Sequence, residues 1–125
     1  MSIGPIVPQF SPSFGYSHKL KTLYKQGKLP TVTHGLYLQP LKPDSVSLEH
    51  IIPHSKGGPT VLWNLALADQ KANALRSNKD IKQFLTEDMI KKYLDQFTDV
   101  VVDGFKGNKY KELLTKTFTK LGFKL

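Results

Sequence analysis

Two short stretches in which apolar residues alternate with polar or small ones flank a turn-rich segment, and a helix-forming run follows the second stretch at once. The stretches lie at 46–50 and 61–67, and the run between them reads Ser-Lys-Gly-Gly-Pro. Glycine reaches positive φ freely and proline donates no hydrogen bond, so a loop is expected there. Asp69 is a suitable N-cap for the helix formers at 70–76. This order predicts a strand hairpin, with Trp63 in the core, followed by a helix.

Four polar residues occupy defined places in this unit. Glu49 and His50 are neighbours at the end of the first stretch, and Asn64 and Asn73 follow His50 by 14 and 23 residues. A helix that crosses the hairpin would bring Asn73 back to Glu49 and His50. Neighbouring residues on a regular strand point to opposite faces, so Glu49 and His50 can serve one site only if the chain bends there.

This set resembles the HNH nuclease motif, and its spacings match those of the HNH domain in RNA-guided CRISPR nucleases. The Gly57-Gly58 pair and the Asn64-Leu65 dipeptide also stand where that family has them. The resemblance implies an α+β domain with a ββα-metal (HNH) hairpin-helix centre flanked by additional helices. It also implies hydrolysis of phosphodiester bonds in DNA, leaving a 5′-phosphate and a 3′-hydroxyl.

The family's roles can be carried over residue by residue. His50 matches the general base, a role that suits an imidazole with an ordinary pKa of about 6.5. Glu49 and Asn73 match the metal ligands, and Asn64 matches the residue that orders the loop near the base. Three basic side chains are candidates for holding phosphate, with a solvated surface role as the alternative: Arg76, Lys56 and His54.

The ligand set predicts one divalent cation, Mg²⁺ with Mn²⁺ as the alternative, because hard cations prefer oxygen ligands. A structural zinc is excluded as a cysteine site, since the chain has no cysteine. Gly35, Leu38, Asp69 and Ala72 stand where many family members carry zinc-binding cysteines. We expect packing by Leu38 and Ala72 and capping by Asp69 to replace that metal.

The charge balance predicts a polyanionic partner. Lys and Arg number 18 against 10 Asp and Glu, for a net charge of +8. Binding to DNA mainly through phosphates, weakening with salt, is the physical expectation. Two other classes remain open: a catalytically silent nucleic-acid-binding module that keeps the HNH fold, and an interaction protein that meets an acidic partner through its lysines.

The length of 125 residues predicts a single domain, as a monomer or homodimer. We expect an irregular arm at 1–16, an HNH core at about 35–79 and helices at about 80–125. Finer expectations are a capped helix from Ser17 to about Lys25, a strand near 32–38, a helix after a capping box at 77–80, another from Thr86, a loop at 99–108 and a final helix over 110–121. The absence of cysteine, of a signal segment and of a membrane span predicts a cytoplasmic protein.

Overall fold

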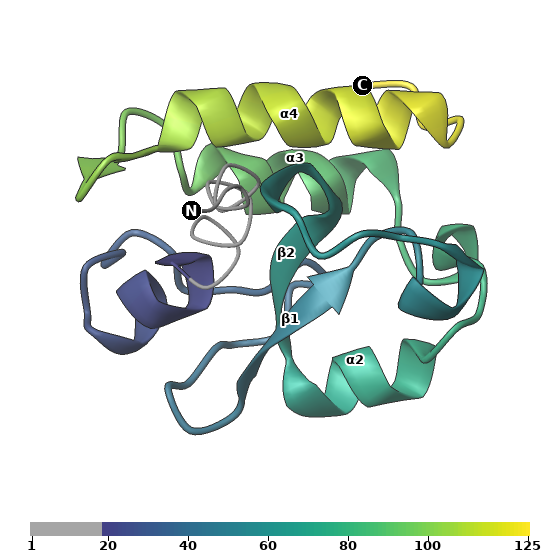
Figure 1. Cartoon of the computed structure of the whole chain (residues 1–125), viewed down its shortest axis with the longest axis horizontal. Coiled ribbons are helices and arrows are strands. Elements are labelled where there is room, and N and C mark those ends of the chain that lie inside the picture. The colour runs from purple at the N-terminus through teal and green to yellow at the C-terminus, as the bar shows by residue number, and fades with distance from the viewer. Residues whose placement is uncertain (1–18) are drawn as a thin grey trace, which may run out of the picture.

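The computed structural model describes residues 19–125 and shows a mixed α and β chain with two small antiparallel sheets. The arm expected at 1–16 and the capping residue Ser17 lie outside the described residues. A central hairpin separates α2 on one side from α3 and α4 on the other (Figure 1). The chain is helical over 19–25, which agrees with the expected end near Lys25, and Gly27, at a φ of 75°, follows this helix.

The predicted hairpin and helix are present. Strand β1 (Val46–His50) pairs antiparallel with β2 (Leu65–Asp69), with Leu48 opposite Leu67. Helix α2 (Gln70–Arg76) follows β2 without a break and packs on both strands. Asp69 caps it as predicted, because its carboxylate accepts from the backbone N–H groups of Lys71 and Ala72.

The prediction for the second strand was wrong at its beginning. Residues Leu62–Asn64 form a 3-10 turn, so the ladder starts only at Leu65. Trp63 consequently lies outside the core and remains 40% exposed. From Leu65 to Ala68 every residue is buried, so both faces of β2 are covered.

Two buried tyrosines form hydrogen bonds with the backbone at the outer edge of β2, where no third strand pairs among residues 19–125. The backbone N–H of Leu67 donates to the Tyr93 hydroxyl at 2.9 Å, and the Tyr110 hydroxyl donates to the Leu65 carbonyl at 2.7 Å. The backbone N–H of Leu36 donates to the carbonyl of Leu67. An open strand edge is thereby paired inside the molecule instead of being left available to another chain.

These tyrosines come from the two long helices that complete the core. Helix α3 (Glu87–Asp95) begins after Thr86, whose hydroxyl accepts from Met89, as predicted. Helix α4 (Gly107–Lys120) covers the expected final helix. Each helix buries an apolar stripe, and the central members of the two stripes are Ile90, Tyr93, Leu94, Tyr110, Leu114 and Phe118.

Three finer expectations were wrong. No strand forms near 32–38, where the described backbone makes only an isolated bridge between His34 and Pro40 and Leu38 has a positive φ of 61°. The capping box at 77–80 opens only the 3-10 turn Ile81–Gln83, which Asp80 caps. The segment 99–108 contains a small hairpin of β3 (Val101–Val102) and β4 (Phe105–Lys106).

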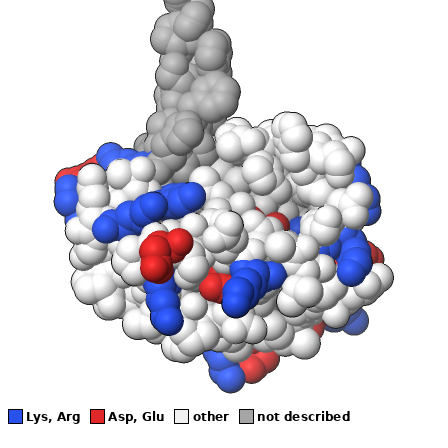
Figure 2. All heavy atoms as spheres, turned by 90° about the horizontal axis from the view of Figure 1, so that it is seen from below, with Lys and Arg blue, Asp and Glu red and all other residues white. Residues whose placement is uncertain are grey.

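Charged residues are mixed on the face opposite α4. Figure 2 shows this face from below, with Lys and Arg side chains next to Asp and Glu and no continuous basic patch. Among residues 19–125, no helix combines the length and the apolar character needed to cross a membrane.

Candidate active site

His50 lies at the end of β1 with a half-buried side chain. Its Nε2 is hydrogen-bonded to the Thr60 hydroxyl at 2.8 Å, and the ring of His54 stands edge-on at 5.9 Å between centroids. Burial and, second, the nearby charge of His54 lower the pKa of His50 below its ordinary value of 6.5. At neutral pH the imidazole is therefore uncharged and able to accept a proton.

Glu49 points away from solvent and is only 3% exposed. The Tyr37 hydroxyl donates to one carboxylate oxygen, and the Arg76 guanidinium lies 3.4 Å from the other. Burial raises the pKa of Glu49, while the hydrogen bond from Tyr37 and the charge of Arg76 oppose that shift. In this arrangement the carboxylate is an internal group whose charge is already balanced by a guanidinium.

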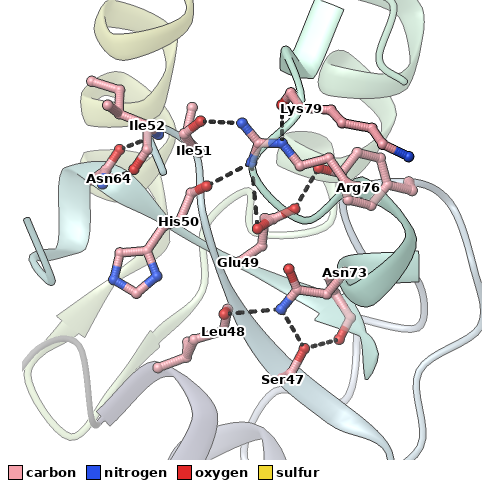
Figure 3. A network of polar contacts seen from close by, with 12 residues as sticks. Ser47, Leu48, Glu49, His50, Ile51, Ile52, Asn64, Asn73, Arg76 and Lys79 are labelled. Atoms are coloured by element: carbon pink, nitrogen blue, oxygen red, sulfur yellow. Dashed lines mark hydrogen bonds and ion pairs between the residues drawn. The ribbon is translucent and has the colours of Figure 1, made fainter. Parts of the chain in front are cut away.

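Arg76 is buried as well, with 1% of its surface exposed. Its Nε donates to the Lys79 carbonyl at 2.8 Å, Nη1 to the His50 carbonyl at 2.8 Å and Nη2 to the Ile51 carbonyl at 3.0 Å. Both roles considered for Arg76, phosphate ligand and solvated helix face, therefore need correction. The side chain is a clamp between the end of α2 and the end of β1 (Figure 3).

The bend that Glu49 and His50 would need in order to serve one site occurs only after the pair. The pairing of β1 with β2 stays regular through His50, and the chain bends only at Ile51 and Ile52. The His50 ring and the Glu49 carboxylate accordingly lie on opposite sides of the strand (Figure 3). The two neighbours do not meet in one site in this structure.

Asn64 is fully buried and closes the loop that follows His50. Its Oδ1 accepts from the backbone N–H of Ile52 at 2.8 Å, and its Nδ2 donates to the carbonyls of Ile52 and Pro59 at 3.1 and 2.9 Å. Its own carbonyl accepts from Ile51 at 2.9 Å. These bonds hold the two ends of the loop together and set the position of Thr60, the partner of His50.

Asn73 reaches β1 from α2, as the crossing helix was expected to allow. Its Nδ2 donates to the Ser47 hydroxyl at 3.0 Å and to the Leu48 carbonyl at 3.2 Å. Within residues 19–125 its Oδ1 accepts no hydrogen bond from protein. Of the two predicted metal ligands, Asn73 thus has an amide oxygen available to a cation.

The expected cation fits this geometry only in part. The described residues gather no group of three or more His, Cys, Asp or Glu side chains that would hold a metal ion. The predicted ligands are one carboxylate and one amide, and the carboxylate of Glu49 is enclosed by Tyr37 and Arg76. Glu49 does not fit a hydrated divalent cation as it lies, because such ions keep several waters.

The two remaining phosphate candidates are exposed at the surface. His54 and Lys56 belong to the 3-10 turn His54–Lys56, which Gly57 ends in the left-handed conformation. His54 lies against His50, so this turn is the basic surface next to the candidate base.

Sequence reasoning missed Tyr37, Thr60 and Ser47, which contact Glu49, His50 and Asn73. Tyr37 and Thr60 lie 12 and 10 residues from their partners, and Ser47 lies 26 residues from Asn73. Hydroxyl residues at such separations form no local pattern, so no sequence signal would have selected them.

Neither a protein-family model nor a curated protein matches this chain. The motif and the geometry around His50 are therefore the features that point to a function.

Proposed function

We propose that this protein is an HNH-type endonuclease that hydrolyses phosphodiester bonds in DNA with His50 as the general base. The observation that carries the proposal is the state of His50, a half-buried imidazole with a lowered pKa. It is supported by the order Glu49, His50, Asn64 and Asn73 on a hairpin and the helix that follows it.

The surroundings of His50 suit proton abstraction from water. Thr60 holds Nε2, and in the described part of the chain Nδ1 makes no hydrogen bond. A water on Nδ1 would give its proton to the ring while its oxygen bonds to phosphorus. The bond to the 3′ oxygen then breaks with its electron pair, and that oxygen takes a proton from solvent. The products are a 5′-phosphate and a 3′-hydroxyl.

Thr60 and Asn64 act in this proposal as positioning residues. The hydroxyl of Thr60 fixes the ring, and the buried amide of Asn64 fixes the loop that carries Thr60. A general base must lie within hydrogen-bond reach of its proton, so small displacements of this loop would slow the reaction.

The proposed reaction includes a divalent cation, and the dependence of cleavage on Mg²⁺ or Mn²⁺ tests that part. Asn73 Oδ1 suits a hard cation, which would supply charge neutralisation at the phosphate when bound. Glu49 would have to exchange Arg76 for the ion before it could hold it. His54 and Lys56 are the side chains available to hold the phosphate.

A second candidate, a silent DNA-binding module with the same architecture, is favoured by the enclosed Glu49–Arg76 pair. A carboxylate neutralised inside the protein needs no metal. The net charge of +8 serves DNA binding under either function, and binding in both cases should weaken as salt rises.

The deciding experiment is cleavage of supercoiled plasmid by the purified full chain in Mg²⁺, in Mn²⁺ and in EDTA. His50→Ala is compared with His34→Ala, because the His34 ring is exposed, lies outside the motif and is hydrogen-bonded to Thr33. Cleavage lost in His50→Ala and kept in His34→Ala, with DNA binding intact in both, supports the nuclease. Salt-dependent binding without cleavage of plasmid or single strands in any condition supports the silent module instead. Cleavage in Mg²⁺ or Mn²⁺ that is lost in EDTA would show separately that the reaction needs a divalent cation.

A further inference from the structure

Trp63 is a partly exposed aromatic residue whose backbone is held by a hydrogen bond from α4. It is the only tryptophan of the chain and is 40% exposed. Its carbonyl accepts a hydrogen bond from the Thr117 hydroxyl of α4 at 2.6 Å, and the next residue is the fully buried Asn64. The backbone of Trp63 is thus fixed on both sides while part of the indole faces water.

Two hollows adjoin Trp63, with Leu113 in the lining of both. The first, of about 460 Å³, is lined mainly by Val61, Leu62, Trp63, Phe105, Lys106 and Lys109. The second, of about 330 Å³, is lined by Ile52, Trp63, Lys116, Thr117, Lys120 and Leu121. Their surfaces are mostly apolar, with lysines at the rims. An apolar surface bordered by cations suits a nucleic acid, because bases stack on aromatic side chains and phosphates bind cations.

The lysines form a stripe along α4. Lys106 precedes the helix, and Lys109, Lys116 and Lys120 follow at spacings that keep them on one side of it. From Lys106 to Lys120 the stripe is about 21 Å long at a rise of 1.5 Å per residue. Such a length accommodates several nucleotides.

One acidic residue lies within the stripe. Glu112 pairs with Lys109 and Lys116 at 3.5 Å each, and all three side chains are more than half exposed. Exposed pairs of this length contribute little energy, so a phosphate can replace the carboxylate. The stripe has this one carboxylate among four lysines, whereas several acidic and basic side chains lie next to one another on the face in Figure 2.

We propose that Trp63, its two hollows and the α4 lysines bind an unpaired stretch of nucleic acid, with a base stacked on the indole and phosphates on the lysines. This inference rests on the proposed function and narrows its substrate to DNA with unpaired bases. In a duplex, neighbouring bases cover each base face, so the indole gains a stacking partner only from an unpaired base. The second hollow is lined in part by Ile52, which is two residues beyond His50 in the chain.

Charge favours a nucleic acid over a second copy of this chain as the occupant. A symmetric contact through this surface would place the lysine stripe of one copy against that of the other. With a net charge of +8 on each chain, such a dimer would be opposed by repulsion. A phosphate backbone is instead complementary to the stripe.

The test is a fluorescence titration of the full-length His50→Ala chain, which leaves the strand uncut. Because Trp63 is the sole tryptophan, quenching of its emission reports directly on stacking. A single-stranded oligonucleotide should quench the emission, and a duplex of the same length should quench it little and bind more weakly.

Affinities of variants are measured by anisotropy of a labelled oligonucleotide. Trp63→Ala should weaken single-strand binding about tenfold or more, and Trp63→Phe should retain most of the affinity. Leu75→Ala is the matched control, because Leu75 is 70% exposed on α2 and lies outside both hollows. Thermal unfolding of each variant checks that the fold is intact.

The lysines are tested by salt dependence. Lys106→Gln with Lys120→Gln should reduce the slope of log K against log salt by about 1.4, since each single-strand phosphate contact contributes about 0.7. Lys25→Gln with Lys91→Gln, exposed lysines outside both hollows, should leave the slope nearly unchanged.

The outcomes separate this inference from the proposed function. His50-dependent cleavage together with unchanged binding in Trp63→Ala would overturn the inference and leave the nuclease standing. Stacking on Trp63 without cleavage of any substrate would overturn the nuclease and leave the inference about nucleic-acid binding standing. Equal quenching by duplex and single strand, or self-association through Trp63 without nucleic-acid binding, would also overturn the inference.

Discussion

Arg76 and Glu49 form an ion pair of 3.4 Å in which both side chains are almost completely buried, 2% and 4% exposed. The same guanidinium donates to carbonyls at His50, Ile51 and Lys79. The pair therefore connects the end of α2 to the end of β1, the strand that carries His50. In a chain without cysteine, this polar clamp joins hairpin to helix.

Arg76→Ala should destabilise the protein by about 3–5 kcal/mol, because it leaves the Glu49 carboxylate buried without its cation. Arg76→Met combined with Glu49→Leu should be more stable than Arg76→Met alone. Both lose the bonds to the three carbonyls, so their difference reports the cost of the uncompensated charge minus the hydrogen bond that Tyr37 loses with Glu49. Urea unfolding measures both effects. The exposed pair Lys92–Asp88 is the control, and Lys92→Ala should cost less than about 1 kcal/mol. An Arg76→Ala variant as stable as the Lys92→Ala control would refute the role of the clamp.

The pKa of His50 should rise towards its ordinary value of 6.5 in His54→Gln, because that change removes the neighbouring charge. It should remain below 6.5, since burial is the larger cause of its shift. NMR titration of the His50 ring measures this, and His34→Gln should leave the value unchanged. A lower pKa of His50 in His54→Gln than in the wild type would contradict the assignment of part of the shift to His54.

A depressed pKa also sets the direction of two pH dependences. His50 contributes stability that is present above its unfolded pKa of about 6.5 and lost as pH falls through the lower folded value. A rate that needs neutral His50 should decline over the same acidic range. In His54→Gln that decline should begin at a higher pH, which a pH–rate profile of plasmid cleavage would detect.

The two glycines of the loop should respond differently to substitution. A Cβ on Gly58 would lie 1.8 Å from the Ile52 carbonyl oxygen, so Gly58→Ala should cost about 1–3 kcal/mol or more. Gly57 has open space around it and a φ of 86°, so Gly57→Ala should cost about 1–2 kcal/mol through backbone strain. Gly57→Asn should recover part of that loss, because asparagine tolerates this conformation. Thermal unfolding of the three variants gives the order of their stabilities. A Gly58→Ala variant as stable as the wild type would contradict the close approach of Gly58 to the Ile52 carbonyl.

Asn64→Ala should lower stability by about 1–3 kcal/mol, because the backbone groups of Ile52 and Pro59 lose a buried partner. Asn64→Asp should also destabilise, since a carboxylate cannot donate to the two carbonyls. Asn78→Ala, at an exposed position, should change stability by less than about 0.5 kcal/mol. Chemical denaturation gives all three values. Equal effects at Asn64 and Asn78 would show that the loop does not depend on this amide.

The sequence by itself determined the hairpin, helix α2 with its Asp69 cap, and the two long helices. Alternation, capping residues and apolar spacing act within a few residues, so a local pattern records them. The strong positive charge and the exclusion of a cysteine zinc site also follow from composition alone.

Only the tertiary structure decided where Arg76 and Trp63 lie. Arg76 is buried because carbonyls 25 and 26 residues away, together with Glu49, satisfy its guanidinium. Trp63 is exposed because the next residue, Asn64, bonds across 12 residues to Ile52 and delays the start of β2. Contacts between distant polar groups leave no periodic trace in the sequence, since their partners are chosen by the folded backbone.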